Sequence, residues 1–463
     1  MTSLAHFDVI VLGGGQAGLT AAITAAENGA TVCILEIAPR ALRGGNTRHT
    51  RNLRPMHESG AFPMEGAYGF DEYLDDLLRV TGGDTDHALA ELTIRESEHS
   101  ITWLQDHGVA FQPPLSGTLQ LGRTNAFFLG GGKALVNSLY RVATNLGVHT
   151  IYEATDIALN ISGDRFIDLT YQQVNNTHHI SGHSLVAAAG GFEANLDWLE
   201  EAWGPAARNF LVRGTPYNKG NILRQLLDAK FKQVGDPGQC HAVAIDGRAP
   251  AYDGGIVSRV DSVPLGIVVN NEGKRFFDEG EDFWPKRYAI WGRLIAAQAD
   301  QIGYAITDAK ADGLFMPTVL PPLKSTTIDD LARQINIPAD SLLKTIDEFN
   351  AATVSGSFDH QALDGCRTEG LPINKSHWAR QIDTPPYSAY PLRPGITFTY
   401  LGVAVDDRAR VQVEGGNPSE NIFAAGEMMA GNILGRGYLA GIGMTIGSVF
   451  GRIAGREAAR HAS

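Results

Sequence analysis

Cysteine is scarce in this sequence, and its spacing argues against several kinds of cofactor. The 463 residues contain three cysteines, Cys33, Cys240 and Cys366. None belongs to a CxxC or CxxCH motif, so we expect neither an iron–sulfur cluster nor a c-type haem attached to this chain. Three isolated cysteines also argue against a disulfide framework. The fourteen histidines show no HExxH motif or other paired spacing, so we expect no metal site.

Long apolar runs and an excess of positive charge are missing as well. The most membrane-like segment, residues 437–453, is rich in glycine, contains Arg452 and is shorter than the ~20 residues of a typical span. A predicted core strand begins at Asp8, which leaves no room for a signal peptide. The net charge of −13 argues against binding to nucleic acid or to anionic membrane surfaces. These features predict a cytoplasmic protein in which any anionic ligand requires a local basic pocket.

Glycine, in contrast, is abundant: 53 residues in a chain long enough for two or three domains. An apolar run, residues 8–12, leads into Gly13-x-Gly15-x-x-Gly18, a helix-like stretch of small residues follows, and a second apolar run ends on Glu36. This order predicts a strand–turn–helix–strand unit whose helix N-terminus binds a pyrophosphate while Glu36 accepts from ribose hydroxyls. The acid favours FAD or NAD over NADP. The residues assigned to the dinucleotide are Gly13, Gly15, Gln16, Ala17, Gly18 and Glu36.

Three further glycine segments follow in the chain: Gly44-Gly45-Asn46-Thr47, Ala189-Gly190-Gly191, and a run from Gly426-Glu427 to Gly441 and Gly443. With the first cluster they resemble, in order, the signatures of the flavoprotein subunits of the fumarate reductase and succinate dehydrogenase superfamily. The resemblance spans nearly the whole chain, is weakest over residues 300–390, and implies that all these segments bind FAD. His49 invites a covalent flavin link. It follows its Gly-Gly pair, whereas the linking histidine of covalent members precedes theirs, so covalent attachment is the less favoured alternative.

The same resemblance implies the domain organisation. It predicts an α/β fold with a Rossmann-like FAD-binding domain formed by residues 1–239 and 386–463, whose parallel sheet has an antiparallel excursion over four strand-like segments, residues 148–152, 154–161, 166–173 and 178–188. An inserted α+β capping domain is expected at residues 240–385, where the composition changes and the glycine-rich turns stop.

Members of the superfamily move a hydride between flavin N5 and one carbon of a dicarboxylate, while an arginine of the capping domain exchanges a proton with the adjacent carbon. The pattern from Gly273 to Glu279 resembles the segment that precedes this arginine, and the next arginine is Arg287. We therefore assign Arg287 as the catalytic proton carrier, with Tyr288 as the alternative, because an arginine of ordinary pKa is a fixed cation. His241 resembles the substrate-binding histidine and is expected to donate to a carboxylate.

Several positions depart from the fumarate reductase pattern. The second substrate histidine is replaced by Phe398, and the C-terminal substrate arginine falls near Tyr438, with Arg436 two residues earlier. The expected acid–arginine relay is missing, and Arg259 lies in its place. The predicted substrate-binding residues are His241, Arg259, Tyr400, Arg436 and Tyr438, with Arg51 or Arg54 as further candidates.

This variant set looks most similar to the FAD-dependent tricarballylate dehydrogenases within the superfamily. The resemblance implies oxidation of tricarballylate, a small polycarboxylate, to cis-aconitate, with electrons passed to a separate membrane iron–sulfur/haem protein. Three carboxylates would account for the surplus of arginines. Two alternatives remain open. One is a fumarate reductase-like or 3-ketosteroid dehydrogenase-like enzyme, the latter favoured by tyrosines 288, 400 and 438. The other is a flavin-binding protein without redox turnover.

Overall fold

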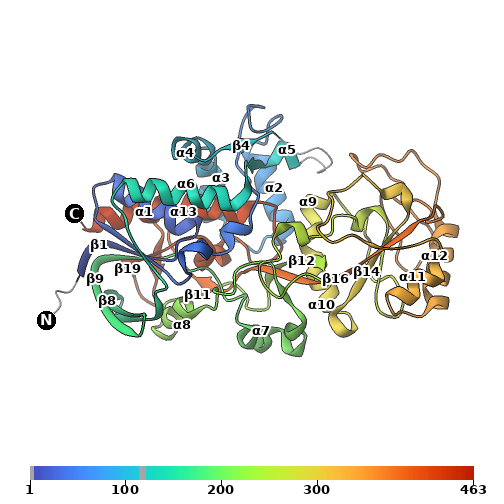
Figure 1. Cartoon of the computed structure of the whole chain (residues 1–463). Coiled ribbons are helices and arrows are strands. Elements are labelled where there is room, and N and C mark those ends of the chain that lie inside the picture. The colour runs from blue at the N-terminus through green and yellow to red at the C-terminus, as the bar shows by residue number, and fades with distance from the viewer. Residues whose placement is uncertain (1–4, 114–120, 463) are drawn as a thin grey trace.

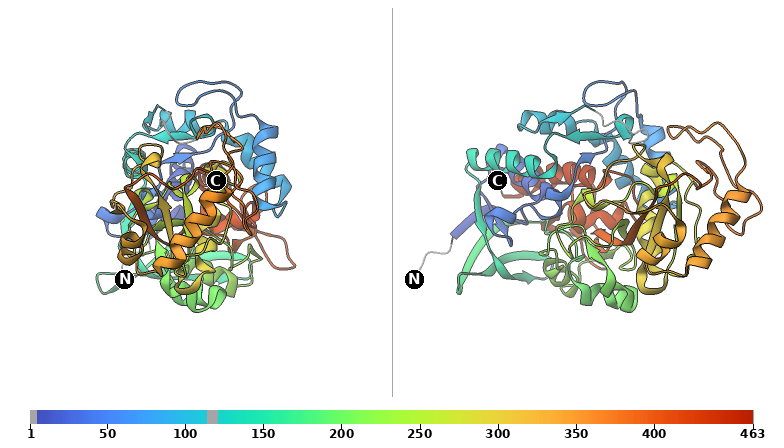
Figure 2. Two further views of the ribbon diagram at one scale, coloured as in Figure 1. Left: turned by 90° about the vertical axis from the view of Figure 1, so that its right-hand side faces the viewer. Right: turned by 45° about the vertical axis from the view of Figure 1, so that its right-hand side comes forward.

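Two β-sheets organise the chain in the computed structural model, which describes residues 5–113 and 121–462. An eight-stranded sheet lies at the end of the molecule that carries both termini, and a six-stranded sheet extends toward the opposite end (Figure 1). Figure 2 shows the helices near residues 328–352, drawn in orange, at the end farthest from the N-terminus.

The eight-stranded sheet is the predicted parallel sheet. Its main path runs β18-β19-β9-β1-β2-β6, and β19, β9, β1, β2 and β6 pair in parallel. Strand β7 pairs with β8 and β8 with β9, both antiparallel, so the predicted antiparallel excursion is confirmed for its last three segments. Its first segment was placed wrongly, because residues 149–152 form β6 and pair in parallel with β2. The strands are β1 (Ala5–Leu12), β2 (Val32–Glu36), β6 (His149–Tyr152), β7 (Thr155–Ser162), β8 (Arg165–Gln173), β9 (Asn176–Ala187), β18 (Arg410–Gln412) and β19 (Pro418–Ala424).

Helices α1 (Gln16–Glu27), α6 (Gly131–Asn145) and α13 (Ile442–Ala462) lie together along this sheet (Figure 1). Helix α13 contains much of the glycine-rich segment 437–453. Its glycines face α1: a Cβ at Gly455 would lie 2.3 Å from the Ala21 carbonyl oxygen, and one at Gly451 would lie 2.8 Å from that of Ala17. The apolar segment is therefore a buried helix that needs glycine for close packing. Among the described residues, no helix has the length and hydropathy of a membrane span.

The remaining N-terminal elements pack around this layer. They are α2 (Phe70–Thr81), α3 (His87–Ser97), α4 (Ser100–Asp106), α5 (Leu121–Thr124) and the small sheet β3 (Asn52–Leu53), β5 (Ala126–Phe128) and β4 (Phe111–Gln112). Residues 70–106 thus contribute three of these helices. A second group connects the two large sheets: α7 (Leu196–Trp203), α8 (Asn221–Asp228) and the pair β11 (Gln233–Val234) and β17 (Gly402–Val403).

The six-stranded sheet is built around β16 (Tyr387–Thr399), which pairs with β10 (Leu211–Val212), β12 (Cys240–Asp246), β14 (Gly303–Thr307) and β15 (Leu323–Ser325), while β13 (Ile267–Val269) pairs with β14. Its helices are α9 (Trp284–Arg287), α10 (Trp291–Ala296), α11 (Ile328–Gln334) and α12 (Ala339–Ala352). Strands β10 and β16 lie outside residues 240–385, so this sheet extends beyond the predicted capping segment at both ends.

Candidate active site

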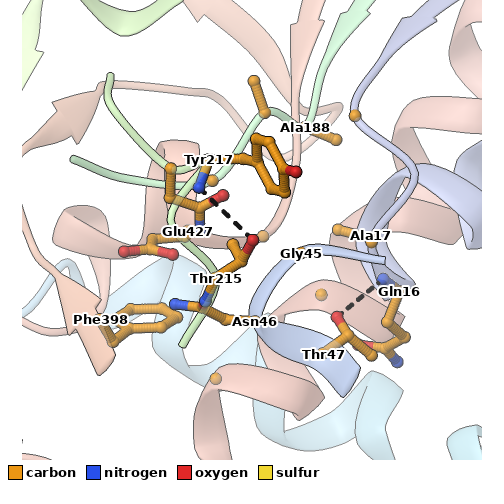
Figure 3. A pocket seen from close by; sticks show the side chains of 18 of the residues that line it. Gln16, Ala17, Gly45, Asn46, Thr47, Ala188, Thr215, Tyr217, Phe398 and Glu427 are labelled. Carbon is orange, nitrogen blue, oxygen red and sulfur yellow. Dashed lines mark hydrogen bonds between the residues drawn. The ribbon is translucent and has the colours of Figure 1, made fainter. Parts of the chain in front are cut away.

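A continuous pocket begins at the turn between β1 and α1, where glycine is required twice. Gly13 has φ +99°, and a Cβ there would lie 2.4 Å from the Ala188 carbonyl oxygen. A Cβ at Gly18 would lie 1.9 Å from the Gly13 carbonyl oxygen. The Gln16 amide donates to the Thr47 hydroxyl at 3.0 Å, which ties the start of α1 to the second glycine segment (Figure 3). The helix N-terminus thus faces the pocket, as a pyrophosphate-binding turn requires.

Glu36, at the end of β2, lines the pocket and holds three segments together. Its side chain is 3% exposed and accepts the amides of Gly14 (3.1 Å), Ala38 (2.9 Å) and Gly44 (3.3 Å). Burial raises the pKa of the carboxyl, and these hydrogen bonds act in the opposite direction. Glu36 therefore orients the glycine turn in addition to facing the position expected for a ribose.

Asn46 joins the second and third glycine segments to the six-stranded sheet. Its Nδ2 donates to the Thr397 carbonyl at 2.7 Å and to the Glu193 carboxylate, and its Oδ1 accepts the Thr215 amide at 2.8 Å. Figure 3 shows Asn46 between Thr215 and Phe398 on the pocket wall. One short amide side chain thus holds together segments that lie far apart in the sequence.

All predicted cofactor residues line this pocket except three glycines. Gly18, Gly44 and Gly191 lie directly behind the wall, where a Cβ would meet the Gly13 carbonyl, Val136, or Thr399 and Glu427, respectively. The Gln16 side-chain nitrogen Nε2 is buried with no hydrogen-bond partner among the described residues. An elongated pocket with a glycine turn, a helix N-terminus, an acid at the second strand and an unpaired buried amide fits an extended dinucleotide such as FAD.

Glu193 and Glu427 form a buried pair of carboxyl groups beside this wall. Glu193 accepts from Asn46 and from the Asn218 amide nitrogen (2.7 Å), and Glu427 accepts from the backbone amide (2.7 Å) and hydroxyl (3.0 Å) of Thr399. Burial raises the pKa of Glu193 to about 7, and burial together with the charge of Glu193 raises the pKa of Glu427 well above its ordinary value. Two neighbouring buried carboxyls favour a state in which one proton is retained.

The far end of the pocket carries the aromatic and basic side chains. His241, on β12, is 3% exposed, stacks on Tyr438 and meets Tyr288 edge-on with ring centroids 5.4 Å apart. Its Nδ1 is buried without a hydrogen-bond partner in the described structure. Burial, together with the charges of Arg213 and Arg259, holds the pKa of His241 well below its ordinary value. The imidazole is therefore neutral and has a ring nitrogen available to a ligand.

Arg259 also lies at this end, where the structure corrects one prediction. The Arg259 guanidinium pairs with Asp261, with Nη2 and Oδ2 2.8 Å apart, and lies 4.7 Å from the centre of the Tyr288 ring. Asp261 also accepts from the Trp284 indole at 2.7 Å. The sequence placed Arg259 where the family's acid–arginine relay is expected and offered no acid for it, and the structure gives Arg259 an acid partner two residues later in the chain.

Two further arginines line this end of the pocket. Arg51 was only a general candidate from the sequence, and Arg213 was not predicted at all. Arg213 follows β10, and its amide donates to the Ile396 carbonyl at 2.8 Å, which places it beside β16. A clear sequence signal was lacking, because β10 has two residues and the following loop departs from the family pattern.

Four of the predicted residues do not line this pocket. Arg287 is 28% exposed and pairs with Glu281, so the helical turn of α9 directs it away, while the next residue, Tyr288, points in. Arg436 is exposed and donates to the Thr81 carbonyl at 2.8 Å. Tyr400 is fully buried and donates to the Gly437 carbonyl. Arg54 is 1% exposed and donates to Ala440 and Tyr68.

His49 lies on the pocket wall, with its Nε2 2.6 Å from Asp253 Oδ1. Burial lowers the pKa of His49 although the Asp253 charge acts in the opposite direction. In the described part of the chain, no group of three or more His, Cys, Asp or Glu side chains is arranged to hold a metal ion.

Comparisons with known proteins agree with this architecture. The model of a family described as the FAD binding domain matches residues 8–444. An NADH:acrylate oxidoreductase of Vibrio harveyi is 24% identical, with 92% of this chain and 48% of that protein covered. The probable fumarate reductase of Shewanella frigidimarina is 25% identical, with 98% and 75% covered. This chain thus spans about half the length of the first relative.

Solved structures share the fold. A flavocytochrome c3 fumarate reductase in an open conformation superposes with a TM-score of 0.76 at 21% identity, covering 99% of this chain and 79% of the other. A 3-ketosteroid-Δ4-(5α)-dehydrogenase of Rhodococcus jostii superposes with a TM-score of 0.75 at 20% identity, covering 99% and 98%.

Proposed function

Because the chain belongs to the FAD binding domain family and FAD is its cofactor, we propose that it is a flavin-dependent oxidoreductase that interconverts a saturated polycarboxylate and its alkene. The best candidate reaction is oxidation of tricarballylate to cis-aconitate. When bound, FAD supplies the hydride acceptor or donor for this chemistry.

One observation carries the proposal. Arg51, Arg213 and Arg259 line the same end of the pocket, and the charge of Asp261 acts on all three. The whole chain has a net charge of −13, so this is a local concentration of positive charge against the overall balance. Guanidinium groups bind carboxylates through paired hydrogen bonds. A steroid-binding pocket would instead require an apolar lining.

We assign the proton transfer to Tyr288. The Tyr288 side chain is buried and lines the pocket, and burial raises the pKa of its hydroxyl. Four guanidinium groups, those of Arg259, Arg213, Arg51 and Arg54, act in the opposite direction, although the net shift of this pKa is upward. The protonated Tyr288 hydroxyl can therefore give a proton to the substrate during reduction, and the nearby guanidinium groups would stabilise the phenolate that takes the proton back during oxidation, which an arginine of ordinary pKa does poorly.

The other side chains position the substrate. His241, held neutral, donates one ring N–H to a substrate carboxylate, and its stack on Tyr438 fixes the ring plane. Phe398 and Tyr438 form an apolar wall that limits water at the reacting carbons. Electrons leave to a separate electron-transfer protein, as expected for a tricarballylate dehydrogenase.

A steroid- or fumarate-type activity is the second candidate, favoured by the tyrosines Tyr288 and Tyr438 in the pocket and by the fold shared with both enzyme classes. An anaerobic absorbance titration of FAD-loaded protein separates the candidates. We expect tricarballylate to bleach the flavin band while succinate and a 3-ketosteroid do not. Bleaching by succinate or the steroid alone would transfer the assignment to that class. A flavin that is neither bleached by these compounds nor reoxidised by cis-aconitate or fumarate after reduction would contradict the redox proposal.

A further inference from the structure

Arg213 is a buried cation that forms no ion pair with any of the described residues. Its side chain is 5% exposed and lines the pocket, and its Nε and Nη1 are buried with no hydrogen-bond partner among the described residues. A buried, unpaired donor costs about 1–3 kcal/mol, and more when it is charged. Such a side chain is expected to face a ligand that completes its hydrogen bonds.

The Arg51 guanidinium is also buried and incompletely hydrogen-bonded. Its Nη2 is buried without a partner in the described structure, and the contacts of its guanidinium are the Met316 sulfur, 3.5 Å from Nη1, and the Phe127 ring, 5.8 Å from its centre. Neither neighbour carries charge. Burial lowers the pKa of Arg51 to about 9 and that of Arg213 to about 10, and repulsion from Arg259 contributes to both.

The other two arginines of this region differ. Arg259 is already neutralised by the paired hydrogen bonds to Asp261, and Arg54 is satisfied by Ala440 and Tyr68. Arg51 and Arg213 are therefore the two cations of this end that form no direct ion pair with a carboxylate among the described residues, although the charge of Asp261 acts on both from farther away. Both interact with Arg259, Asp261 and Tyr288, which places them at the far end of the pocket and not at the glycine turn that would hold a pyrophosphate.

We propose that Arg51 and Arg213 form a carboxylate subsite of their own, which binds one substrate carboxylate and selects acids that carry it over analogues that lack it. This assignment rests on the proposed polycarboxylate function and adds which side chains recognise the extra carboxylate. A carboxylate between the two guanidinium groups would satisfy the unpaired N–H groups and offset the repulsion between the cations.

The test compares ligands that differ by one carboxylate. Glutarate is tricarballylate without the central carboxylate, and methylsuccinate is tricarballylate without a terminal one. Calorimetric titration of dithionite-reduced, FAD-loaded protein measures binding without turnover, because reduced flavin cannot accept a hydride from a saturated acid. Wild type, Arg213→Gln and Arg51→Gln are compared, with Arg208→Gln as the matched control, since Arg208 pairs with Asp197 and Glu200 on the surface.

We expect each pocket variant to bind tricarballylate at least about tenfold more weakly, as for the loss of a charged hydrogen bond. For whichever analogue lacks the carboxylate held by the subsite, the loss should be less than about twofold, and Arg208→Gln should match wild type. Equal losses for all three ligands, or no loss for any, would overturn the subsite. So would failure of the reduced wild type to bind tricarballylate.

Two controls keep the outcome interpretable. The melting temperature of ligand-free Arg213→Gln should be no lower than that of wild type, because the substitution removes an unpaired buried charge. If either glutamine variant fails to retain FAD, the corresponding lysine variant, which keeps the charge but cannot form paired hydrogen bonds, should show a smaller selective loss. If the variants lose affinity selectively but tricarballylate does not bleach the oxidised flavin, the subsite is supported and the redox proposal is contradicted. If tricarballylate bleaches the flavin but the variants show no selective loss of affinity, the redox proposal is supported and the subsite is contradicted.

Discussion

His241 stacks on Tyr438 with ring centroids 3.8 Å apart and ring planes inclined by 12°. His241 belongs to β12 of the six-stranded sheet, whereas Tyr438 lies in the glycine-rich run before α13, so the stack joins two segments almost two hundred residues apart. The Tyr438 hydroxyl oxygen also accepts a hydrogen bond from the Gly443 amide at 3.1 Å. The histidine ring is therefore fixed before any substrate arrives.

Replacement of His241 by phenylalanine should separate its packing role from its hydrogen bond. The His241→Phe ring can keep the stack, so we expect a melting temperature close to that of wild type. The lost hydrogen bond to a charged carboxylate should raise KM by roughly 10–100-fold. Steady-state kinetics with tricarballylate provide the measurement, and an unchanged KM would show that His241 serves packing alone.

Tyr288 and Arg287 are neighbours in sequence, but their substitution should affect the rate of flavin reduction very differently. Tyr288→Phe removes the proposed proton carrier from the pocket and should slow flavin reduction by roughly 10²–10⁴-fold, with FAD still bound. Arg287→Ala removes a surface ion pair with Glu281 and should leave the rate within about twofold. Stopped-flow absorbance gives both rates. The reverse pattern would restore the arginine as the proton carrier.

The FAD-binding half was largely predictable from the sequence because its signals are local. Glycines with positive φ or backbone contacts closer than a Cβ allows, such as Gly13 and Gly18, leave a fixed spacing in the sequence. The acid at the end of β2 follows from the same unit. The antiparallel excursion was predictable because its strands are long and apolar at alternating or continuous positions.

The substrate end was less predictable because it depends on long-range pairing. Strand β16 contains Pro391 and Pro394, residues that usually argue against a strand interior. It nevertheless aligns β10 and β12, and so brings Arg213 and His241 to one pocket. The chain direction where α9 ends at Arg287 and the 3-10 turn Tyr288–Ile290 begins decides that Tyr288 and not Arg287 enters the pocket. Neither the pairing nor the chain direction at the end of so short a helix is visible in the residue pattern.

Glu36 should matter to the shape of the nucleotide turn as well as to the cofactor. Glu36→Ala leaves the buried amides of Gly14, Ala38 and Gly44 without their acceptor. At about 1–3 kcal/mol for each unsatisfied group, we expect loss of FAD and a lowered melting temperature. Flavin absorbance per protein and thermal unfolding measure the two effects. Glu414→Ala, an exposed acid, is the control, and FAD retention by Glu36→Ala would contradict the proposed role.

Glu193 should give the folded protein a pH dependence of a defined sign. Its pKa is raised from the ordinary 4.5 to about 7 in the folded chain, chiefly by burial. Between these values the folded state holds a proton that the unfolded chain releases, so this contribution to stability is full below about pH 4.5 and is lost as the pH rises toward 7. Glu193→Gln keeps a neutral side chain and removes that contribution.

The difference between Glu193→Gln and wild type isolates this effect, because every other group titrates in both proteins. We expect the melting temperature of the FAD-loaded variant, relative to that of wild type, to increase as the pH rises from 5 to about 7. Above about pH 7 this difference in melting temperature should stay constant. Glu420→Gln, which removes an exposed acid paired with Arg165, should show no such trend. A difference that does not change with pH would mean that Glu193 is ionised throughout this range. The neighbouring Glu427 would then be the group that holds the proton of the pair, since two charged carboxyls at this distance in a buried site are strongly disfavoured.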